Sequence, residues 1–419
     1  MKKVMPKWAK ILIAIVCSLV VVAGGVFGGI KIYENNLYKK VLEMPVFAIN
    51  TEGGKDIVSK EEYIGCEVSV SNTSEQYSFE NFEGKIKGRG NSTWNESNKK
   101  PYKLKFSEKV DLFGNGKSKT WTLIANFQDN SGIRNYLAYA IGNELDDLKY
   151  TSKTQFVDLW LNGKYVGVYL VCEQVETGSN RVDVEEDLSV GVDTGYLIEQ
   201  DGRAPDEGEE GVDYFVCEGR NFALKTPDTE DEEYSVDYLN FIKNYFEQCF
   251  VALKGDDFSA VEALIDVNTF ADSYIINELF KNNDVDYSSF YLYKDAGGKL
   301  CSGPIWDYDS CAGNSPNVSD NKTNSIIANK NKFYSYLLEF DEFKQILKTK
   351  INKYYEPIKD LIEDECEYLE ETYEKSFERN FRKWKCSYRG KGIGGWDDHV
   401  EYVEEWLESS LKYLKKTYC

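Results

Sequence analysis

The sequence contains very little histidine, and this scarcity disfavours several kinds of catalytic site. Its 419 residues include a single histidine, His399. A histidine-rich zinc site and a Ser–His–Asp triad elsewhere in the chain would both depend on this residue type. No two cysteines have the Cys-x-x-Cys spacing, so a zinc ribbon is not expected either. The ten cysteines are scattered, which is typical of small core residues. Cys301 with Cys311 and Cys366 with Cys386 are the pairs closest in sequence, although spacing alone does not establish a disulfide bond.

Positive charge is the second shortage, and it bears on nucleic-acid binding. The chain has 50 Lys and Arg residues against 71 Asp and Glu residues, a formal net charge of −21. Proteins that bind DNA or RNA neutralise phosphates with Lys and Arg, so no nucleic-acid partner is expected. An acidic chain can still bind a nucleotide through a few local cations and a metal ion. Hydrophobic residues make up 42% of the sequence, enough for a sizeable folded core.

An uncharged apolar run long enough to cross a bilayer as a helix spans residues 11–30. Four lysines precede it: Lys2, Lys3, Lys7 and Lys10. Short positive flanks tend to stay in the cytoplasm, and no A-x-A cleavage site follows the run. We therefore expect residues 1–10 to be a cytoplasmic tail and residues 11–30 a transmembrane signal anchor rather than a cleaved signal. The protein would be a single-pass protein of the cell membrane, with its large domain outside the cytoplasm.

The rest of the chain changes from strand-like to helical patterns. Residues 31–44 are expected to form a polar helical linker, and residues 45–419 a large domain. Short apolar runs separated by Gly, Asn and Asp predict strands within residues 66–126, at 66–72, 83–90, 102–106 and 119–126. Residues 155–175 read as a hairpin, because Asn162-Gly163 separates two alternating runs. Residues 195–201 and 214–219 are also strand-like.

Helical spacing first occurs at residues 131–145, with Ser131 as a candidate N-cap. It dominates after residue 236, where apolar residues recur three and four apart. The expected helices lie at 236–253, 268–283, 330–380 and 398–416, and a second hairpin interrupts them at 288–309. The predicted fold class is therefore α+β, a mostly β half followed by a mostly α half.

The segment GRGNSTW, Gly88 to Trp94, is a small polar turn that follows a predicted strand. Glycine allows the backbone to approach a ligand, and exposed N–H groups can hold phosphate oxygens. The candidate phosphate-binding residues are Gly88, Arg89, Gly90, Asn91 and Ser92. Taken alone, however, the segment is more typical of an ordinary hairpin turn.

Two lysines on the next predicted strand are candidate ligands of nucleotide phosphates. Lys103 and Lys105 lie two residues apart in KKPYKLKF and so face the same side of a strand. A lysine that follows a Gly-bearing loop is well placed to bind phosphates. The alternative is a solvated strand face, which is the usual position of lysine.

Polar residues also mark the next junction, in QDNSGIRN. Asp129, Arg134 and Asn135 lie where a strand gives way to a helix. A helix N-terminus there would favour an anion, but Asp129 would equally serve as a helix cap.

Two short segments carry paired carboxylates. Asp284 and Asp286 follow a predicted helix in NNDVDYSSF, and Asp307 and Asp309 follow an apolar run in PIWDYD. Loops that end elements often carry catalytic carboxylates, and one hairpin separates the two segments. Their convergence on one divalent cation would suit Mg²⁺ or Mn²⁺, which prefer oxygen ligands.

These segments, in this order, resemble the CotH family of atypical protein kinases. The resemblance rests on GRGNSTW, KKPYKLKF, DNSGIRN, LNGKYVGVYLVCEQV, the Asp284 segment and PIWDYD, and extends from about residue 44 to the C-terminus. It implies an atypical protein-kinase-like bilobal fold with a β-rich N-lobe and an α-rich C-lobe. It also implies transfer of phosphate from ATP, with Mg²⁺ or Mn²⁺, to Ser or Thr of surface or secreted proteins.

The resemblance also implies roles for individual residues. Asp284 would be the catalytic-loop aspartate and Asp307 a metal-binding aspartate, with Asp309 as a further metal ligand. Lys103 or Lys105 would bind the nucleotide, and the LVCEQ segment, which contains Glu173, would form the hinge that faces the adenine. One departure concerns Ser289, which stands where the family often has Asn. The glycosylation sequon at Asn91 lies in the proposed phosphate loop, so no glycan is expected there.

Two other functions compete with a kinase. A catalytically weak or inactive surface or coat protein on the same fold would account for Ser289. A glycoside hydrolase would use paired carboxylates and aromatic residues such as Trp306, but it leaves the lysine strand without a role.

Overall fold

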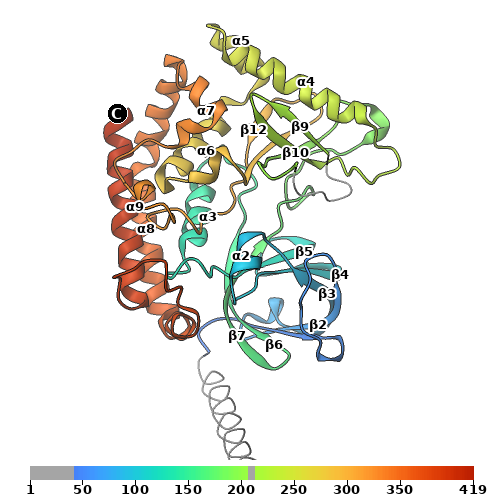
Figure 1. The fold of residues 1–419 in the computed structure, drawn as a ribbon, viewed down its shortest axis with the longest axis vertical. Coiled ribbons are helices and arrows are strands. Elements are labelled where there is room, and N and C mark those ends of the chain that lie inside the picture. Colours follow the sequence, from blue (N-terminus) through green and yellow to red (C-terminus); the bar gives the residue numbers. More distant parts are fainter. Residues whose placement is uncertain (1–41, 206–212) are drawn as a thin grey trace, which may run out of the picture.

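The computed structural model describes residues 42–205 and 213–419. The expected membrane anchor at 11–30 and all but the end of the expected linker lie outside these residues. Within the two described stretches, no helix combines the length and apolar character needed to span a bilayer. The fold is a mixed α+β structure, with a β-barrel in the N-terminal region and a helical C-terminal part (Figure 1).

The barrel contains all the strands that were predicted before residue 175. Its strands close in the order β1-β2-β3-β4-β5-β7-β6, with β1 parallel to β6 and the remaining neighbours antiparallel. They span β1 (Val46–Thr51), β2 (Ile64–Ser71), β3 (Phe79–Gly88), β4 (Tyr102–Asp111), β5 (Lys117–Ile124), β6 (Thr154–Leu161) and β7 (Lys164–Glu173). Side chains on alternate positions of each strand point into the barrel. In β4 these are Tyr102, Leu104 and Phe106, which are buried in its core.

The predicted hairpin is confirmed as β6 and β7. Asn162 and Gly163 both have positive φ, 49° and 72°, as the tight turn between them requires. Asn162 also accepts a hydrogen bond from the backbone N–H of Thr51 at 2.9 Å, which fixes the turn against β1.

A second sheet, which was not predicted as a unit, combines strands from both halves of the chain. It is five-stranded and antiparallel, in the order β12-β11-β8-β10-β9. Its strands are β8 (Tyr196–Gln200), β9 (Tyr214–Cys217), β10 (Arg220–Thr226), β11 (Phe290–Lys294) and β12 (Leu300–Ser302). The predicted second hairpin forms β11 and β12 and joins strands that lie about ninety residues earlier, a pairing that local patterns do not reveal.

The helices are α2 (Ser92–Glu96), α3 (Arg134–Glu144), α4 (Val236–Leu253), α5 (Phe258–Leu264), α6 (Val267–Phe280), α7 (Lys332–Leu337), α8 (Asp341–Trp384) and α9 (Trp396–Tyr418). The predicted helical ranges are occupied by helices, but α2 and α5 were not predicted and the range 330–380 is divided into α7 and α8. In Figure 1, α8 and α9 run side by side along one edge of the molecule, and α3 and α6 lie inside them. Every residue of α6 except Asn268 is buried, because α3, α8, α9 and β12 surround it.

A buried ion pair fastens α8 to the barrel. Arg379 of α8 contacts the carboxylate of Asp158 on β6 at 2.5 Å, and both side chains are almost completely buried. Ser376 and Tyr165 donate further hydrogen bonds to the same carboxylate, at 3.4 and 3.2 Å. Together these bonds offset the free-energy cost of removing the Asp158 carboxylate from water.

All nine cysteines of the described residues are free, so neither of the two closest pairs forms a disulfide bond. Eight of them are buried or partly buried. This agrees with their expected role as small core residues.

The single histidine provides a direct prediction about pH. His399 of α9 is buried, and this burial lowers its pKa from 6.5 to about 4. The negative charges of Asp129 and Asp398 oppose the shift, whereas Arg134 and Lys385 add to it. Because the folded-state pKa is the lower one, the stabilisation is complete above pH 6.5 and is lost as pH falls towards 4.

Relative to a His399→Gln variant, the parent should therefore lose up to about 3 kcal/mol of unfolding free energy between pH 6.5 and 4. NMR measures the cause directly, because one histidine gives one set of imidazole resonances. Titration of those resonances near pH 6.5 in the folded protein would contradict the prediction.

Candidate active site

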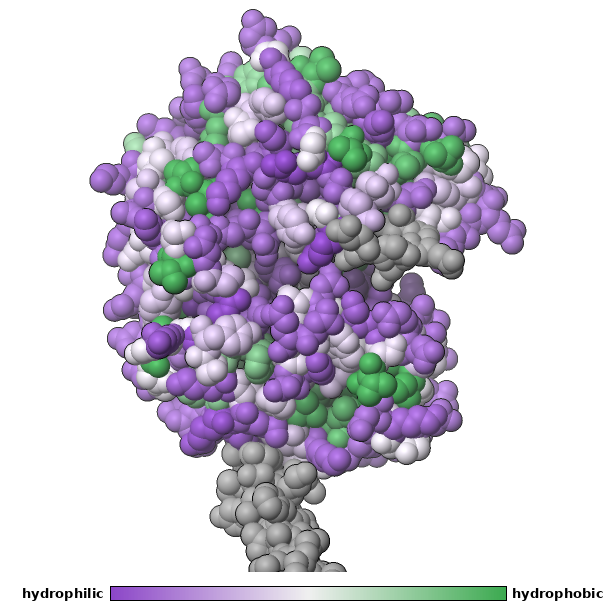
Figure 2. Space-filling model, viewed as in Figure 1, coloured by the Kyte–Doolittle hydropathy of each residue, from purple (hydrophilic) through white to green (hydrophobic). Residues whose placement is uncertain are grey.

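A cavity of about 520 Å³ lies where the barrel meets the second sheet and α3. This volume is within the range of small-molecule binding sites. The surface is hollowed between the barrel and the part of the molecule above it in Figure 2, and most residues on that face are hydrophilic. The lining residues of the cavity that carry charge are Lys60, Glu61, Arg89, Glu199, Asp201, Arg203, Lys225, Asp307 and Asp309.

The Gly-bearing segment forms one wall. Four of the five candidate phosphate-binding residues line the cavity: Arg89, Gly90, Asn91 and Ser92. Gly90 has a φ of 80°, so the loop turns through a conformation that favours glycine. The Arg89 guanidinium stacks over the Trp306 ring, 5.4 Å from its centroid.

Gly88 has a different position from its four neighbours in the segment. It ends β3 and is not among the lining residues. A Cβ atom on Gly88 would lie 2.3 Å from the ring of Trp94, so the glycine permits the tryptophan to pack on the backbone. The sequence suggested that a ligand would approach the backbone at Gly88. The group that does so is the ring of Trp94, from the same motif.

The two candidate lysines of β4 do not line the cavity either. Both project from the outer face of the barrel, where Lys103 lies opposite Lys87 and Lys105 opposite Lys85. Lys105 is exposed, in agreement with the solvated alternative, and Lys103 is half-buried. Burial lowers the pKa of Lys103, and the negative charge of Glu176 opposes that shift.

Glu173 lies at the end of β7 and is likewise outside the lining of the cavity. Its carboxylate accepts a hydrogen bond from Arg181 at 3.0 Å. Burial raises the pKa of Glu173 to about 7, and the Arg181 charge limits the rise. The Glu173 side chain is thus paired with Arg181, in the segment that follows β7.

Asp284 and Asp286 differ in whether their carboxylates are paired with a basic side chain. Asp286 is held by Arg220 of β10 through two bonds, of 2.8 and 2.5 Å. Asp284 forms no ion pair within the described residues and is exposed to solvent at its loop. Partial burial by the surrounding protein nevertheless raises its pKa, and the positive charge of Arg203 opposes the rise.

Asp307 and Asp309 project into the cavity because the residue between them points away from it. Tyr308 donates its backbone N–H to Asn135 at 2.7 Å and its hydroxyl to Asn277 at 3.0 Å. Asp307 has a φ of 67°, an uncommon conformation that is typical of functional loops.

The electrostatics of these carboxylates are unfavourable to their charged forms. The Asp307 side chain is exposed to the cavity, yet the protein that encloses the site raises its pKa, first by desolvation and then through the negative charge of Asp284. The pKa of Asp309 rises to about 7, again through desolvation and then through Asp307 and Asp129. The charge of Asp284 therefore acts on Asp307, and that of Asp307 acts on Asp309, although Asp284 does not itself line the cavity.

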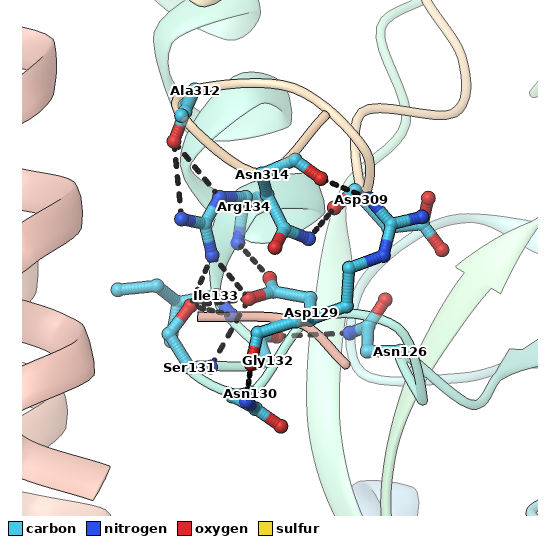
Figure 3. Close-up of polar contacts among 12 residues, drawn as sticks. Asn126, Asp129, Asn130, Ser131, Gly132, Ile133, Arg134, Asp309, Ala312 and Asn314 are labelled. Atoms are coloured by element: carbon cyan, nitrogen blue, oxygen red, sulfur yellow. Dashed lines mark hydrogen bonds and ion pairs between the residues drawn. The ribbon is translucent and has the colours of Figure 1, made fainter. Parts of the chain in front are cut away.

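The DNSGIRN segment supports this loop from behind. Asp129 accepts the backbone N–H of Arg134 at 3.0 Å and bonds to its guanidinium at 2.5 Å (Figure 3). Arg134 in turn donates to the carbonyls of Cys311 and Ala312, at 3.0 to 3.1 Å. Asp129 thus binds the first N–H group of α3 from outside the helix, whereas the N-cap position itself is Ile133, which has no side-chain cap bond. Helix α3 begins at Arg134, so Ser131 is not its N-cap; Asp129 accepts the hydroxyl of Ser131.

The connection between α8 and α9 braces the same loop. Arg389, in this connection, donates to the carbonyl of Asn314 and to the Gln128 side chain, the latter at 3.1 Å. Asn314 itself donates to the Asp309 carbonyl at 2.7 Å (Figure 3). It also donates to the Gln128 carbonyl at 2.9 Å. The C-terminal helices thus contribute to the position of Asp309.

The donors present fit a divalent cation. Asp307 and Asp309 supply carboxylate oxygens on one wall, and their mutual repulsion would be relieved by a nearby positive charge. No group of three or more His, Cys, Asp or Glu side chains within residues 42–205 and 213–419 is arranged to hold a metal by itself. Mg²⁺ suits such a site, because it usually combines one or two carboxylates with waters and substrate phosphates.

Sequence reasoning missed the wall that the second sheet provides. Glu199 and Asp201 at the end of β8 line the cavity and pair with Lys225 and Arg203, at 3.0 and 3.2 Å. The available signal was the change from apolar YLI to polar EQDGR within one predicted strand. Ser289, the departure from the family pattern, also lines the cavity.

The sequence was compared with models of protein families and with curated proteins. A family model described as CotH kinase protein matches residues 86–414, more than half of the chain. No curated protein matches the sequence.

Proposed function

The chain belongs to the CotH kinase protein family, and from this premise we propose that its cavity binds ATP and transfers the γ-phosphate to a Ser or Thr hydroxyl. Membership of the family implies atypical kinase activity, the use of ATP and a protein substrate. The observation that carries the proposal for this cavity is that the Arg89–Ser92 loop and the Asp307–Asp309 loop both line it, with the Arg89 guanidinium 5.4 Å from the ring of Trp306. One wall suits phosphate oxygens and the other suits the cation that accompanies them.

The residues of the chain have separate tasks in this proposal. The Arg89 guanidinium and the loop that follows it bind and orient the phosphates, since phosphoryl transfer depends on positioning and on charge stabilisation. Asp284 accepts the proton of the acceptor hydroxyl. Its raised pKa brings it closer to the operating pH, which favours a general base.

Asp307 and Asp309 would hold Mg²⁺ or Mn²⁺, which supplies charge neutralisation at the phosphates. The Asn135 and Arg134 bonds described above keep their backbone fixed. In this arrangement the barrel acts as the N-lobe of a kinase-like bilobal fold and the helical part acts as the C-lobe.

The location of the enzyme is a further part of the proposal. Residues 11–30 would anchor the protein in the cell membrane with residues 45–419 outside the cytoplasm, where surface or secreted proteins are the substrates. Protease added to intact cells should digest the large domain. Full protection of the domain until the cells are opened would contradict this topology.

Phosphate transfer is the direct test of the function. The purified protein is incubated with γ-labelled ATP and Mn²⁺ or Mg²⁺, together with a Ser-rich acceptor protein. We expect label on the acceptor or on the protein itself, and an increase in melting temperature with ATP and metal. Absence of both would refute the proposal.

Ser289 favours a second candidate, a weakly active surface or coat protein on the same fold. If its position calls for a side-chain carbonyl ligand, Ser289→Asn should lower the metal concentration needed for half-maximal activity or ATP binding by about 5- to 10-fold. Ser289→Ala serves as the matched control, because it changes the hydroxyl without adding a carbonyl. An unchanged metal requirement in Ser289→Asn would show that the departure is neutral.

A further inference from the structure

The basic side chains of the cavity differ in whether a carboxylate already neutralises them. Lys225 pairs with Glu199 at 3.0 Å, and Arg203 pairs with Asp201 at 3.2 Å. Arg89 forms no ion pair among the described residues. The remaining cation is Lys60, which lies in the connection between β1 and β2.

The Lys60 ammonium is held at the Gly-bearing loop. It donates to the side-chain oxygen of Asn91 at 3.2 Å, and both residues line the cavity. The backbone fixes this contact, because Gly88 donates its N–H to the Ser59 carbonyl at 2.8 Å. Lys60 is half-buried, and its bond to Asn91 already directs the ammonium toward the Gly-bearing loop.

The neighbouring carboxylate is directed elsewhere. Glu61 also lines the cavity, but its side chain accepts a hydrogen bond from the Ser59 hydroxyl at 3.0 Å. The same hydroxyl oxygen accepts the backbone N–H groups of Glu61 and Glu62, both at 3.1 Å. The Glu61 carboxylate is thus bonded to Ser59 and the Lys60 ammonium to Asn91. The Ser59 hydroxyl is the main reason that the pKa of Glu61 is lowered, and the Lys60 charge makes a smaller contribution.

We infer that Lys60 is a phosphate-binding residue and that, with Arg89, it provides the positive charge for the phosphate chain of the bound nucleotide. The inference rests on the proposed function and adds a residue that lies outside the matched family segment, residues 86–414. It also replaces Lys103 and Lys105 in that role, because neither lines the cavity.

The test compares ATP and adenosine binding at constant Mn²⁺ in three lysine variants. Lys60→Met should bind ATP about 10-fold more weakly than the parent, the loss expected for one charge-assisted bond, and bind adenosine equally well. Lys60→Arg should retain most of the ATP affinity. Lys55→Met is the matched control, an exposed lysine of the same connection that lies 3.9 Å from Glu52.

Kinetics separate binding from a general structural effect. KM for ATP should rise in Lys60→Met while kcat changes little, because a charge that binds ground state and transition state alike affects KM alone. Equal ATP affinity in parent and Lys60→Met, or an equal loss in Lys55→Met, would overturn the inference and leave the kinase proposal standing. Failure of the parent itself to bind ATP would overturn both.

Discussion

Replacement of Asp307 by asparagine is expected to slow phosphate transfer by at least about a thousandfold without destabilising the metal-free protein. The catalytic loss follows from removal of a carboxylate that would hold the cation at the phosphates. Stability should be equal or higher, because desolvation and the charge of Asp284 both raise the pKa of Asp307 and so disfavour its charged form. Asparagine also tolerates the φ of 67° at this position.

Thermal unfolding and labelled phosphate transfer measure the two halves of this prediction. ATP and Mn²⁺ should raise the melting temperature of the parent and leave that of Asp307→Asn almost unchanged. Asp256→Asn is the control, since Asp256 is an exposed carboxylate between α4 and α5. Transfer by Asp307→Asn within about tenfold of the parent rate would remove Asp307 from the machinery.

Loss of the Arg134 side chain is expected to give the largest effect on stability, about 3–5 kcal/mol for Arg134→Ala. The Asp129 carboxylate would remain buried without its partner, and the carbonyls of Cys311 and Ala312 would lose their donors. Because these carbonyls belong to the loop that carries Asp309, phosphate transfer should fall as well. Denaturant unfolding measures the first effect.

The double variant Asp129→Asn with Arg134→Met distinguishes an unpaired charge from lost packing. It removes both charges and keeps much of the volume, so it should recover a large part of the stability lost in Arg134→Ala. Activity need not return, because methionine cannot donate to the Cys311 and Ala312 carbonyls. A change of less than about 1 kcal/mol in Arg134→Ala would mean that the ion pair contributes little.

Local patterns were sufficient to predict most of the secondary structure. Asn162-Gly163 placed the β6–β7 hairpin, and apolar spacing placed α4 at residues 236–253. The second sheet was not predicted, because β8 pairs with β10 and β11 through contacts between distant residues. Short strands alone do not specify which sheet they join.

The candidate site was predicted in part. The loop at Arg89 and the aspartates at Asp307 and Asp309, singled out by their motifs, line one cavity, while their roles as ligands stay predictions. Motif order did not show that Gly88 packs against Trp94, because that requires the position of a ring six residues away. Nor did strand alternation show which face of the barrel borders the cavity, and this is why Lys103 was expected there.

The sequence also could not distinguish the roles of Asp284 and Asp286. The sequence offers two carboxylates in one loop, and only the structure shows that Arg220 of β10 binds Asp286. Arg220 lies 66 residues earlier in the chain, so no local pattern connects them. The assignment of Asp284 as the base therefore depends on the position of the second sheet.

The most direct test of the account measures labelled phosphate transfer by the parent, Asp284→Asn and Asp286→Asn side by side. The account predicts transfer by the parent, transfer within about tenfold of it by Asp286→Asn, and a loss of at least about a thousandfold in Asp284→Asn with ATP binding retained. Equal losses in the two variants, or transfer by Asp284→Asn at the parent rate, would contradict the assignment of Asp284 as the residue that accepts the proton of the acceptor hydroxyl.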